Sequence, residues 1–300
     1  MDPWIPITFL AASSQTIRTA IQRHMKGPLG DYGASAIRFI YAIPFAWAWF
    51  VFVLCTSDSV LPKPNMAFSI WLCIGGITQI LFTVLLVKLF TYKNFLVGIA
   101  FSKTEVLIAA ILEAIVFSVA ITAQFAAAIL LGITAVILLS VSINISSFME
   151  IRNNLISKST FIGLTCGSTL AVSVISFRTA INSLSDGDFL IRASVTAAIA
   201  VILQAIALVI YMYVYRRVEL MAVIQSWRIG LVTGLFGALA TTAWFTAFAI
   251  HTAAPVRAVG QVEIILGSLI TIFVFHQRIS RIEVIGAILL VSSILLVIFN

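Results

Sequence analysis

Two glutamates lie inside long apolar stretches of the sequence, each two residues after a polar or charged neighbour. Glu105 follows Lys103 in the stretch 95–117, and Glu263 follows Gln261 in the stretch 255–275. On insertion scales an ionisable side chain at the centre of a membrane helix costs roughly 2.5–3.5 kcal/mol, so it is expected to face a cavity or a partner. Such carboxylates can bind a proton or the amino group of a small molecule, and the lysine can balance an anionic group.

The helical period separates Lys103 from Glu105. A step of two residues turns a helix by about 200°, so the two side chains cannot share one face. We therefore expect Lys103 to meet a group on another helix. Further candidates for the same site come from other apolar stretches: Arg38, Arg257, Trp244, Phe245 and Phe248.

Each candidate also has a purely structural interpretation. Glu105, Lys103 and Glu263 can form a polar network that only holds helices together, and this interpretation stays open beside the functional one. For Arg38 and Arg257 the favoured interpretation is that the long side chain snorkels to lipid headgroups. For the aromatic residues it is a place on a lipid-facing surface.

The composition indicates that lipid surrounds most of the protein. Of the 300 residues, 61% are hydrophobic and 10% are charged, and the mean hydropathy is +1.13, whereas a soluble domain has roughly 25% charged residues. The net charge of +7 comes mostly from basic residues between apolar stretches, where lipid headgroups are the expected partner. No basic stripe interleaved with aromatic residues is present, so nucleic acid is not expected as a partner.

Ten stretches are long enough to cross a bilayer, which takes about 20 apolar residues. Pro44, near the middle of the second stretch, removes a backbone hydrogen bond and predicts a kink. The sequence thus predicts an all-α integral membrane protein with ten transmembrane helices. The predicted helices are Trp4–Ile21, Gly33–Leu54, Ala67–Phe90, Phe95–Phe117, Ala120–Ile143, Thr160–Ile181, Leu190–Tyr215, Ile229–Ile250, Pro255–Phe275 and Ile282–Phe299.

The two halves of the chain resemble each other. Ile17–Ala20 matches Phe177–Ala180 at one offset, and at nearly the same offset Glu105 falls on Glu263 and Lys103 on Gln261. Each half holds five predicted helices, and an odd number of crossings forces the second half to enter the membrane from the opposite side. This predicts two inverted five-helix repeats, an arrangement found in transporters that work by alternating access. The predicted units are residues 1–145, a polar linker at 146–159, and residues 160–300.

Two glycine pairs spaced by four residues predict close contacts between helices. They are Gly163 with Gly167 and Gly230 with Gly234. Glycine lets the backbones of membrane helices approach each other, although the pattern is common in such helices.

Motifs of nucleotide hydrolysis and metal catalysis do not occur in the sequence. There is no GxGxxG, GxxxxGK[ST] or HExxH pattern, and the widely spaced cysteines form no CxxC pair. We expect neither a cofactor nor a metal. An intramembrane enzyme is the least favoured class, because the three histidines are scattered and supply no cluster of nucleophile, base or metal ligands.

Three parts of the sequence are similar to those of a known family. They are Gln15-Thr16-Ile17-Arg18 with Arg38–Phe45, Phe101–Val106, and Trp244–Ala249 leading to Ala254–Arg257 and Val262-Glu263. Together with ten helices in two halves, they resemble the EamA family of the drug/metabolite transporter (DMT) superfamily over nearly the whole chain. Many members of that family carry a glycine–glutamate pair at the ends of the fourth and ninth helices, where this chain has Ser118-Val119 and His276-Gln277.

The resemblance implies transport of amino acids or other small metabolites, often export, with both termini in the cytoplasm. The basic residues favour the opposite orientation, because a cytoplasmic N-terminus would leave most of them in outside loops. We give the resemblance slightly more weight at this stage, since several of the counted arginines fall near helix ends. The orientation of the termini therefore stays open.

The resulting hypothesis is a secondary transporter for a small polar or zwitterionic, amino-acid-like metabolite, working by alternating access as proton-coupled export or exchange. Glu105 and Glu263 are expected to be the alternating carboxylates, with Lys103 and Arg38 shaping the field around them. The alternative is an uncoupled facilitator whose glutamates and lysine form a structural network. The expected partners are a small-molecule substrate, protons and the lipid bilayer of a bacterial inner (plasma) membrane, and the oligomeric state is left open.

Overall fold

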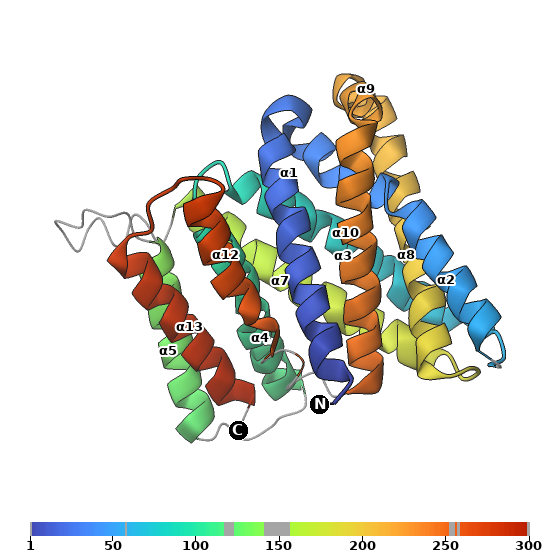
Figure 1. The fold of residues 1–300 in the computed structure, drawn as a ribbon. Coiled ribbons are helices and arrows are strands. Elements are labelled where there is room, and N and C mark those ends of the chain that lie inside the picture. The colour runs from blue at the N-terminus through green and yellow to red at the C-terminus, as the bar shows by residue number, and fades with distance from the viewer. Residues whose placement is uncertain are drawn as a thin grey trace.

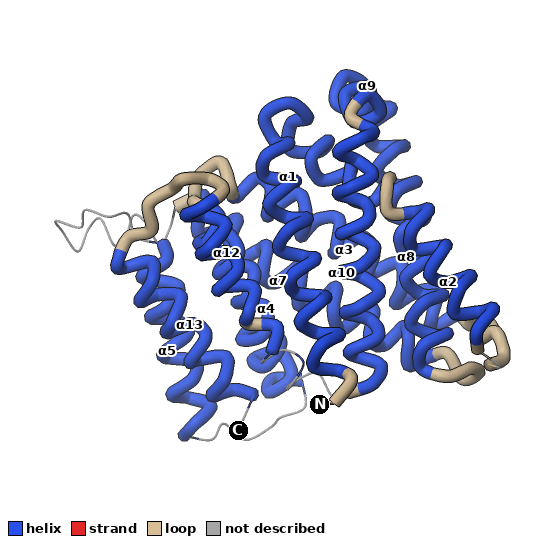
Figure 2. The backbone as a smooth tube through the Cα atoms, viewed as in Figure 1, coloured by secondary structure: helices blue, strands red, loops and turns tan. Residues whose placement is uncertain are grey.

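The computed structural model describes residues 2–57, 59–116, 123–140, 157–251, 256 and 259–298. These residues form helices and their connections, with no strand among them (Figure 2). The described helices, drawn in Figure 1, are α1 (Trp4–Ile40), α2 (Ile43–Thr56), α3 (Met66–Leu89), α4 (Phe95–Val116), α5 (Ala123–Ser140), α7 (Lys158–Ser183), α8 (Phe189–Tyr215), α9 (Arg217–Gln225), α10 (Trp227–Ile250), α12 (Val262–Phe273) and α13 (Arg281–Ile298).

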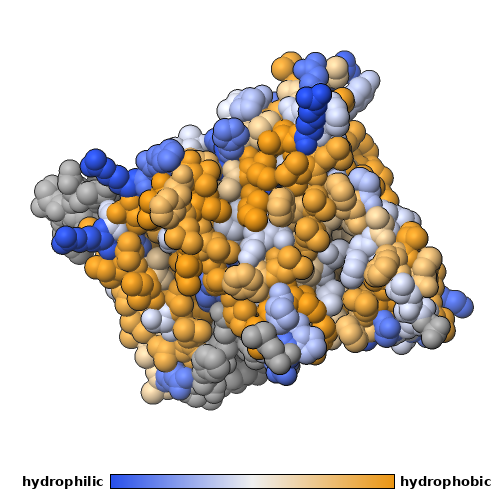
Figure 3. All heavy atoms as spheres, in the orientation of Figure 1, coloured by the Kyte–Doolittle hydropathy of each residue, from blue (hydrophilic) through white to orange (hydrophobic). Residues whose placement is uncertain are grey.

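The predicted all-α class is confirmed for this part of the chain. Figure 3 shows an apolar surface over most of the visible face, with hydrophilic side chains mainly at its two ends, around α9 and the α12–α13 connection and along the opposite edge. Long apolar helices with an apolar outer surface fit a multi-pass membrane protein. Among the described residues, the helical segments long and apolar enough to cross a membrane are Trp4–Thr56, Met66–Leu89, Lys158–Ser183, Phe189–Tyr215 and Trp227–Ile250.

Most described helix ends lie within three residues of the predicted ones. The ninth predicted helix, Pro255–Phe275, is an exception, because α12 covers only Val262–Phe273 and part of the predicted start lies outside the described residues. The short helix α9 is not among the predicted helices. The predicted linker 146–159 lies mostly outside the described residues, and its last two residues belong to α7.

Side-chain caps determine where three long helices begin. Asn65 Oδ1 accepts a hydrogen bond from the backbone N–H of Phe68 at 2.7 Å, and Asp188 Oδ1 accepts one from Ile191 at 2.8 Å. Ser157 caps α7 in the same way. Each cap pairs one of the N–H groups that the first turn of a helix leaves without an intrahelical acceptor.

The first helix continues well past its predicted end at Ile21 and bends at Gly30. Gly30 has φ 70° and ψ −178°, a backbone conformation that glycine alone adopts without strain. The predicted second helix, Gly33–Leu54, therefore starts as the last part of α1. It is interrupted at residues 41–42, just before Pro44 in the first turn of α2. The kink predicted near Pro44 is confirmed.

Two antiparallel helix pairs, α1 with α10 and α3 with α7, make the most extensive contacts. The ring centroids of Trp4 and His251 lie 4.7 Å apart, so the start of α1 adjoins the end of α10. Asn65 Nδ2 donates to the carbonyl of Ser183 at 2.6 Å, which places the start of α3 beside the end of α7. The two pairs thus share one geometry, although they come from different parts of the chain.

Glycines allow the close approach of neighbouring helices, as their spacing predicted. On α7, a Cβ on Gly163 would lie 2.6 Å from the Phe101 ring, and one on Gly167 would lie 3.2 Å from the Phe101 carbonyl. On α10, a Cβ on Gly234 would overlap the carbonyl of Tyr41. α4 therefore lies directly against α7, and the α1–α2 junction directly against α10.

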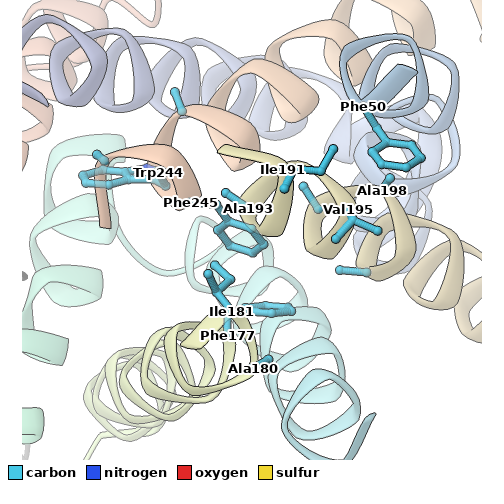
Figure 4. Close-up of a cluster of buried hydrophobic side chains, with 14 of the residues drawn as sticks. Phe50, Phe177, Ala180, Ile181, Ile191, Ala193, Val195, Ala198, Trp244 and Phe245 are labelled. Carbon is cyan, nitrogen blue, oxygen red and sulfur yellow. The ribbon is translucent and has the colours of Figure 1, made fainter. Parts of the chain in front are cut away.

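Aromatic side chains of α7 and α10 pack together in the largest apolar cluster. The rings of Phe177 and Phe245 lie 5.0 Å apart, and Figure 4 shows Ile181 beside them, with Trp244 and Ile191 on either side of Phe245. This cluster fixes α10 relative to α7 and α8, and with them one wall of the site described next.

Candidate functional site

A buried ion pair joins α4 to α12. Lys103 Nζ lies 2.9 Å from Glu263 Oε1, and each side chain is 3% exposed. Gln15 of α1 donates through Nε2 to both carboxylate oxygens of Glu263, at 3.1 and 2.9 Å. Trp244 of α10 donates in turn to Gln15 Oε1 at 3.2 Å. One chain of polar contacts therefore connects α1, α4, α10 and α12, and the expectation that Lys103 meets a group on another helix is confirmed.

The register of α4 against α12 brings the second glutamate into the same region. Lys103 lies opposite Glu263, and a Cβ on Gly267 would meet Ile99 at 2.8 Å. The two helices therefore run antiparallel, so a step forward on α4 corresponds to a step back on α12. The same register brings Glu105 and Gln261 to one level of the bundle, and both are buried. Glu105 faces away from α12, because it lies about 200° around the helix from Lys103.

A cavity of about 50 Å³ adjoins the polar chain. By this measure a single water needs roughly 10–15 Å³, so the cavity accommodates a few waters or a small chemical group. Gln15 lines it together with Glu105 while also binding Glu263, so both predicted glutamates belong to one site. The lining residues are Gln15, Arg18, Gln79, Glu105, Leu170, Ser173, Val174, Phe177, Arg178, Ile181, Thr241, Trp244, Phe245 and Phe248.

Arg18 brings a positive charge into the cavity wall from α1. Its side chain is buried, and it is attracted electrostatically by Glu263. Its Nη2 reaches Thr19 Oγ1 only at 3.5 Å, and among the described residues its Nε has no hydrogen-bond partner. A buried donor of this kind requires an acceptor, which a water or a ligand oxygen can supply. Arg178 of α7 lines the same cavity.

Aromatic rings line the cavity, and Figure 4 shows Trp244 and Phe245 among them. Trp244 and Phe245 are buried, and Trp244 stacks on Phe248 with ring centroids 5.5 Å apart. All three rings line the cavity. The three rings lie at the cavity, and the interpretation that they are on a lipid-facing surface is wrong for the buried Trp244 and Phe245.

Arg38 is close to the site without lining it. It is 3% exposed, so the interpretation that it snorkels to headgroups is wrong. Its guanidinium lies 4.2 Å from the ring centroid of the neighbouring Phe39, and it feels the charge of Arg18. Arg257, the other arginine proposed from the sequence, lies outside the described residues, as does Ser118-Val119.

A second cluster, of one arginine with a glutamine and aromatic rings, connects helices further along α1. Arg23 donates to Gln277 Oε1 at 2.7 Å, and its guanidinium lies 4.2 Å from the ring centroid of Phe275. Phe90 and Phe95 surround the same guanidinium at 5.5 and 5.7 Å. This Arg23 cluster joins α1 to the end of α3, the start of α4 and the segment that follows α12.

Comparisons with known proteins bear on the fold. The sequence matches no protein-family profile, and no curated protein is detectably similar to it. Among solved structures, 26 chains are similar. One of them, described only as "Crystal structure of protein", is 15% identical, with a TM-score of 0.61 over 98% of this chain and 95% of that chain. This similarity shows the fold alone.

Six polar residues of the cavity lining were not predicted as site residues: Gln15, Arg18, Gln79, Ser173, Arg178 and Thr241. The repeated Arg-Thr-Ala at 18–20 and 178–180 was a usable signal, because both copies bring their arginine to the cavity. Gln79 had no signal beyond being polar in an apolar helix. Among the described residues, no three His, Cys, Asp or Glu side chains come together in a way that could hold a metal ion.

Proposed function

We propose that the chain is a secondary transporter that moves a small polar or zwitterionic, amino-acid-like metabolite by alternating access, as proton-coupled export or exchange. The observation that carries the proposal is the polar site within apolar helices, where the Lys103–Glu263 pair adjoins a cavity lined by Glu105 and Arg18. Buried ionisable groups around a cavity in a membrane protein are typical of substrate and ion pathways.

The packing supports two inverted repeats, residues 1–145 and 160–300. In this scheme α1 to α5 correspond in order to α7, α8, α10, α12 and α13. When the halves are exchanged, the α1–α10 contact corresponds to the α7–α3 contact. The α1–α12 contact likewise corresponds to the α7–α4 contact. The α4–α12 and α5–α13 contacts each correspond to themselves. A contact pattern that survives exchange of the halves is expected of a pseudo-two-fold axis.

The length of the first helical segment supports ten membrane crossings. Trp4–Thr56 has 53 residues, which would be about 80 Å long if straight. The hydrocarbon core is only about 30 Å thick. Two crossings by this segment, with the bend at Gly30 as the turn between them, would account for its length.

Exchange of the halves also relates the charged residues of the site. Lys103 and Glu263 map onto Gln261 and Glu105, and Arg18 maps onto Arg178. Glu263 binds Lys103, whereas its counterpart Glu105 lines the cavity together with Arg18. We assign Glu105 to the transported proton or the substrate amino group, and Arg18 to the acidic group of the substrate. A zwitterion presents both groups a few ångströms apart.

The same features support the family assignment that the sequence suggested. We propose that the chain is an EamA-type member of the DMT superfamily in a bacterial inner membrane, on the basis of the sequence stretches named above and the twice-five arrangement of helices. The chain differs from many members at His276-Gln277, where Gln277 binds Arg23.

A facilitator without ion coupling is the second candidate. The close pairing of Lys103 with Glu263 favours it, because a buried pair that neutralises itself can serve only to hold helices in register. An intramembrane enzyme remains the least supported class.

Transport by purified protein in vesicles tests the proposal. A thermal-shift screen of amino acids and related zwitterions identifies the substrate first, because a ligand that binds the folded state raises its stability. Uptake is then measured with and without an imposed pH gradient. Glu105→Gln is expected to abolish the effect of the gradient while the protein still folds. Glu283→Gln is the matched control, because Glu283 lies outside the cavity lining and binds Ser280 and Asn94 at the start of α13.

The outcomes separate the classes. Normal gradient-driven transport by both Glu105→Gln and Glu263→Gln would show the carboxylate assignment to be wrong. A wild-type rate that ignores the gradient would identify a facilitator. Conversion of the ligand into a product in detergent, where no compartments exist, would identify an enzyme.

A further inference from the structure

We propose that the end of the bundle carrying α9 binds the anionic cytoplasmic leaflet through arginine–phosphate contacts, so that both chain termini lie on the opposite side of the membrane. This inference is independent of the transport proposal. It settles an orientation on which the charge pattern and the family resemblance disagree.

Contacts define which connections share the α9 end. Glu219 of α9 accepts from the backbone N–H of Gly33 at 3.1 Å, beside the bend of α1. Lys26, just before that bend, donates to Thr91 at 2.6 Å between α3 and α4. Asn94 donates to Glu283 at 2.7 Å at the start of α13. The bend of α1 and the connections α3–α4, α8–α10 and α12–α13 therefore lie together.

The opposite end holds the start of α1 and the end of α10, together with the α2–α3 and α7–α8 connections. The Trp4–His251 contact joins the first two, and Asp188 donates its backbone N–H to Ser59 at 2.8 Å between the others. Ile7, Phe189 and Ile250 line one groove, which links both groups of segments. In Figure 1 the end of α13 lies at this same edge of the molecule.

Basic residues are gathered at the α9 end. The structure places there Arg23, Lys26, Lys88, Lys93, Lys158, Arg216, Arg217, Arg228, Arg278 and Arg281, against the acidic Asp31, Glu219 and Glu283. At the opposite end, the described acids Asp2, Asp186 and Asp188 offset the basic Lys63 and Arg192. Arg178 lines the cavity inside the bundle and is not counted at that end. Arg18 is buried in the core and belongs to neither end.

The length and the exposed residues of helix α9 are typical of a helix that lies in the headgroup layer. Leu220 and Val223 are buried against the bundle, whereas Val218, Met221 and Ile224 are 85%, 55% and 54% exposed on the outer side. Nine residues are too few to cross a bilayer, and an exposed apolar stripe does not suit water. An amphipathic helix of this kind rests in the membrane interface with its apolar face toward the acyl chains.

Three arginines in and next to α9 are positioned to bind an anion. The guanidinium groups of Arg216, Arg217 and Arg228 lie 5.1, 4.6 and 5.4 Å from the ring centroids of Tyr32, Tyr213 and Trp227. Glu219 accepts through Oε2 from the backbone N–H of Gly33, and its Oε1 makes only a 3.9 Å contact with Arg216. Stacked guanidinium groups in an interfacial belt suit bidentate contacts with lipid phosphates. An excess of Lys and Arg marks the cytoplasmic face of a membrane protein.

Thiol labelling in intact bacterial cells tests the orientation. Cys55 and Cys73 are exposed and are replaced by serine, while the buried Cys166 is kept. A single new cysteine is then introduced as Gln225→Cys at the α9 end or Ser185→Cys at the opposite end. With a membrane-impermeant maleimide, we expect Ser185→Cys to react in intact cells and Gln225→Cys to react only after permeabilisation. The reverse pattern, or equal labelling of both sites in intact cells, would overturn the orientation.

Lipid titration tests the headgroup contacts on the purified protein. Adding phosphatidylglycerol is expected to raise the unfolding temperature more than phosphatidylcholine does, and Arg216→Gln/Arg217→Gln/Arg228→Gln is expected to remove that difference. Arg278→Gln/Arg281→Gln is the matched control, because it lowers the charge of the same end away from α9. An equal response of the wild type to both lipids would overturn the contacts, whatever the labelling shows.

Discussion

At the scale of single residues, the question is whether the Lys103–Glu263 pair only stabilises the fold or takes part in transport. Both side chains are almost fully buried, and Gln15 supplies two further hydrogen bonds to the carboxylate. A buried pair is weak evidence for stability in itself, because the cost of removing two charges from water offsets their attraction. Removing one partner alone is expected to destabilise the protein, because the other charge stays buried without a counter-charge.

Lys103→Met is therefore expected to destabilise the protein by about 3–5 kcal/mol, because Glu263 loses its counter-charge in a dry environment. The double variant Lys103→Met/Glu263→Gln is expected to recover most of that loss. Thermal unfolding in detergent, read as a double-mutant cycle, measures both effects. Lys88→Met at the end of α3 is the control and should change stability by less than about 0.5 kcal/mol. A single variant as stable as the wild type would contradict the pairing.

Arg18→Gln is expected to separate binding from folding. The substitution removes a buried guanidinium whose Nε has no partner among the described residues, so stability should be unchanged or higher. Ligand affinity should fall by roughly 10- to 150-fold, the equivalent of a charge-assisted hydrogen bond of about 1.5–3 kcal/mol. Ligand-induced thermal shifts measure both quantities in one titration. Unchanged affinity with a large loss of stability would make Arg18 a structural residue.

At the scale of elements, apolar length predicted the long helices well and polar helical segments poorly. The first predicted helix stopped at Ile21 because a polar segment with Gly27 and Pro28 follows. α1 continues because its polar groups find partners: Gln22 donates to the Ala34 carbonyl at 2.8 Å and Lys26 pairs with Asp31. Both pairings lie across the bend of α1 at Gly30, so they depend on a change of chain direction that apolar length does not reveal. The helix α9 was missed as well.

The close contact of α10 with the α1–α2 junction leads to a prediction about two glycines. Gly234→Ala is expected to cost about 1–3 kcal/mol, because its Cβ would overlap a backbone carbonyl that cannot rotate away. Gly76→Ala on α3 is the control. Its Cβ would meet only the flexible Gln204 side chain at 3.6 Å, so the better helix propensity of alanine should leave stability unchanged or raise it by up to about 1 kcal/mol. Thermal unfolding of both variants provides the comparison, and equal effects would contradict the packing.

At the scale of the whole molecule, the sequence indicated which residues matter but not which ones meet. Internal similarity placed Glu105 on Glu263 and Lys103 on Gln261. The ion pair that forms crosses between those two sets, from Lys103 to Glu263. Which residues pair follows from the antiparallel register of α4 against α12, and that register is fixed by contacts such as Ile99 with Gly267. Helix register is a three-dimensional property, so a single sequence leaves it open.

Alternating access requires the two ends of the bundle to open in turn, and the Arg23 cluster lies where the α9 end has to open. Arg23 on α1 binds Gln277 beyond α12, so the cluster holds together helices from both halves of the chain. We expect a short thiol-to-thiol cross-linker across Arg23→Cys/Gln277→Cys to stop transport, and a reducible version of it to restore transport on cleavage. The control is Ala128→Cys/Ser293→Cys on α5 and α13, where Ser293 donates to the Ala128 carbonyl at 2.7 Å. Those helices pack along each other at the edge of the bundle, and cross-linking them should leave the rate unchanged. Transport that continues with the Arg23 cluster fully cross-linked would mean that this end stays closed throughout the cycle, which alternating access does not permit.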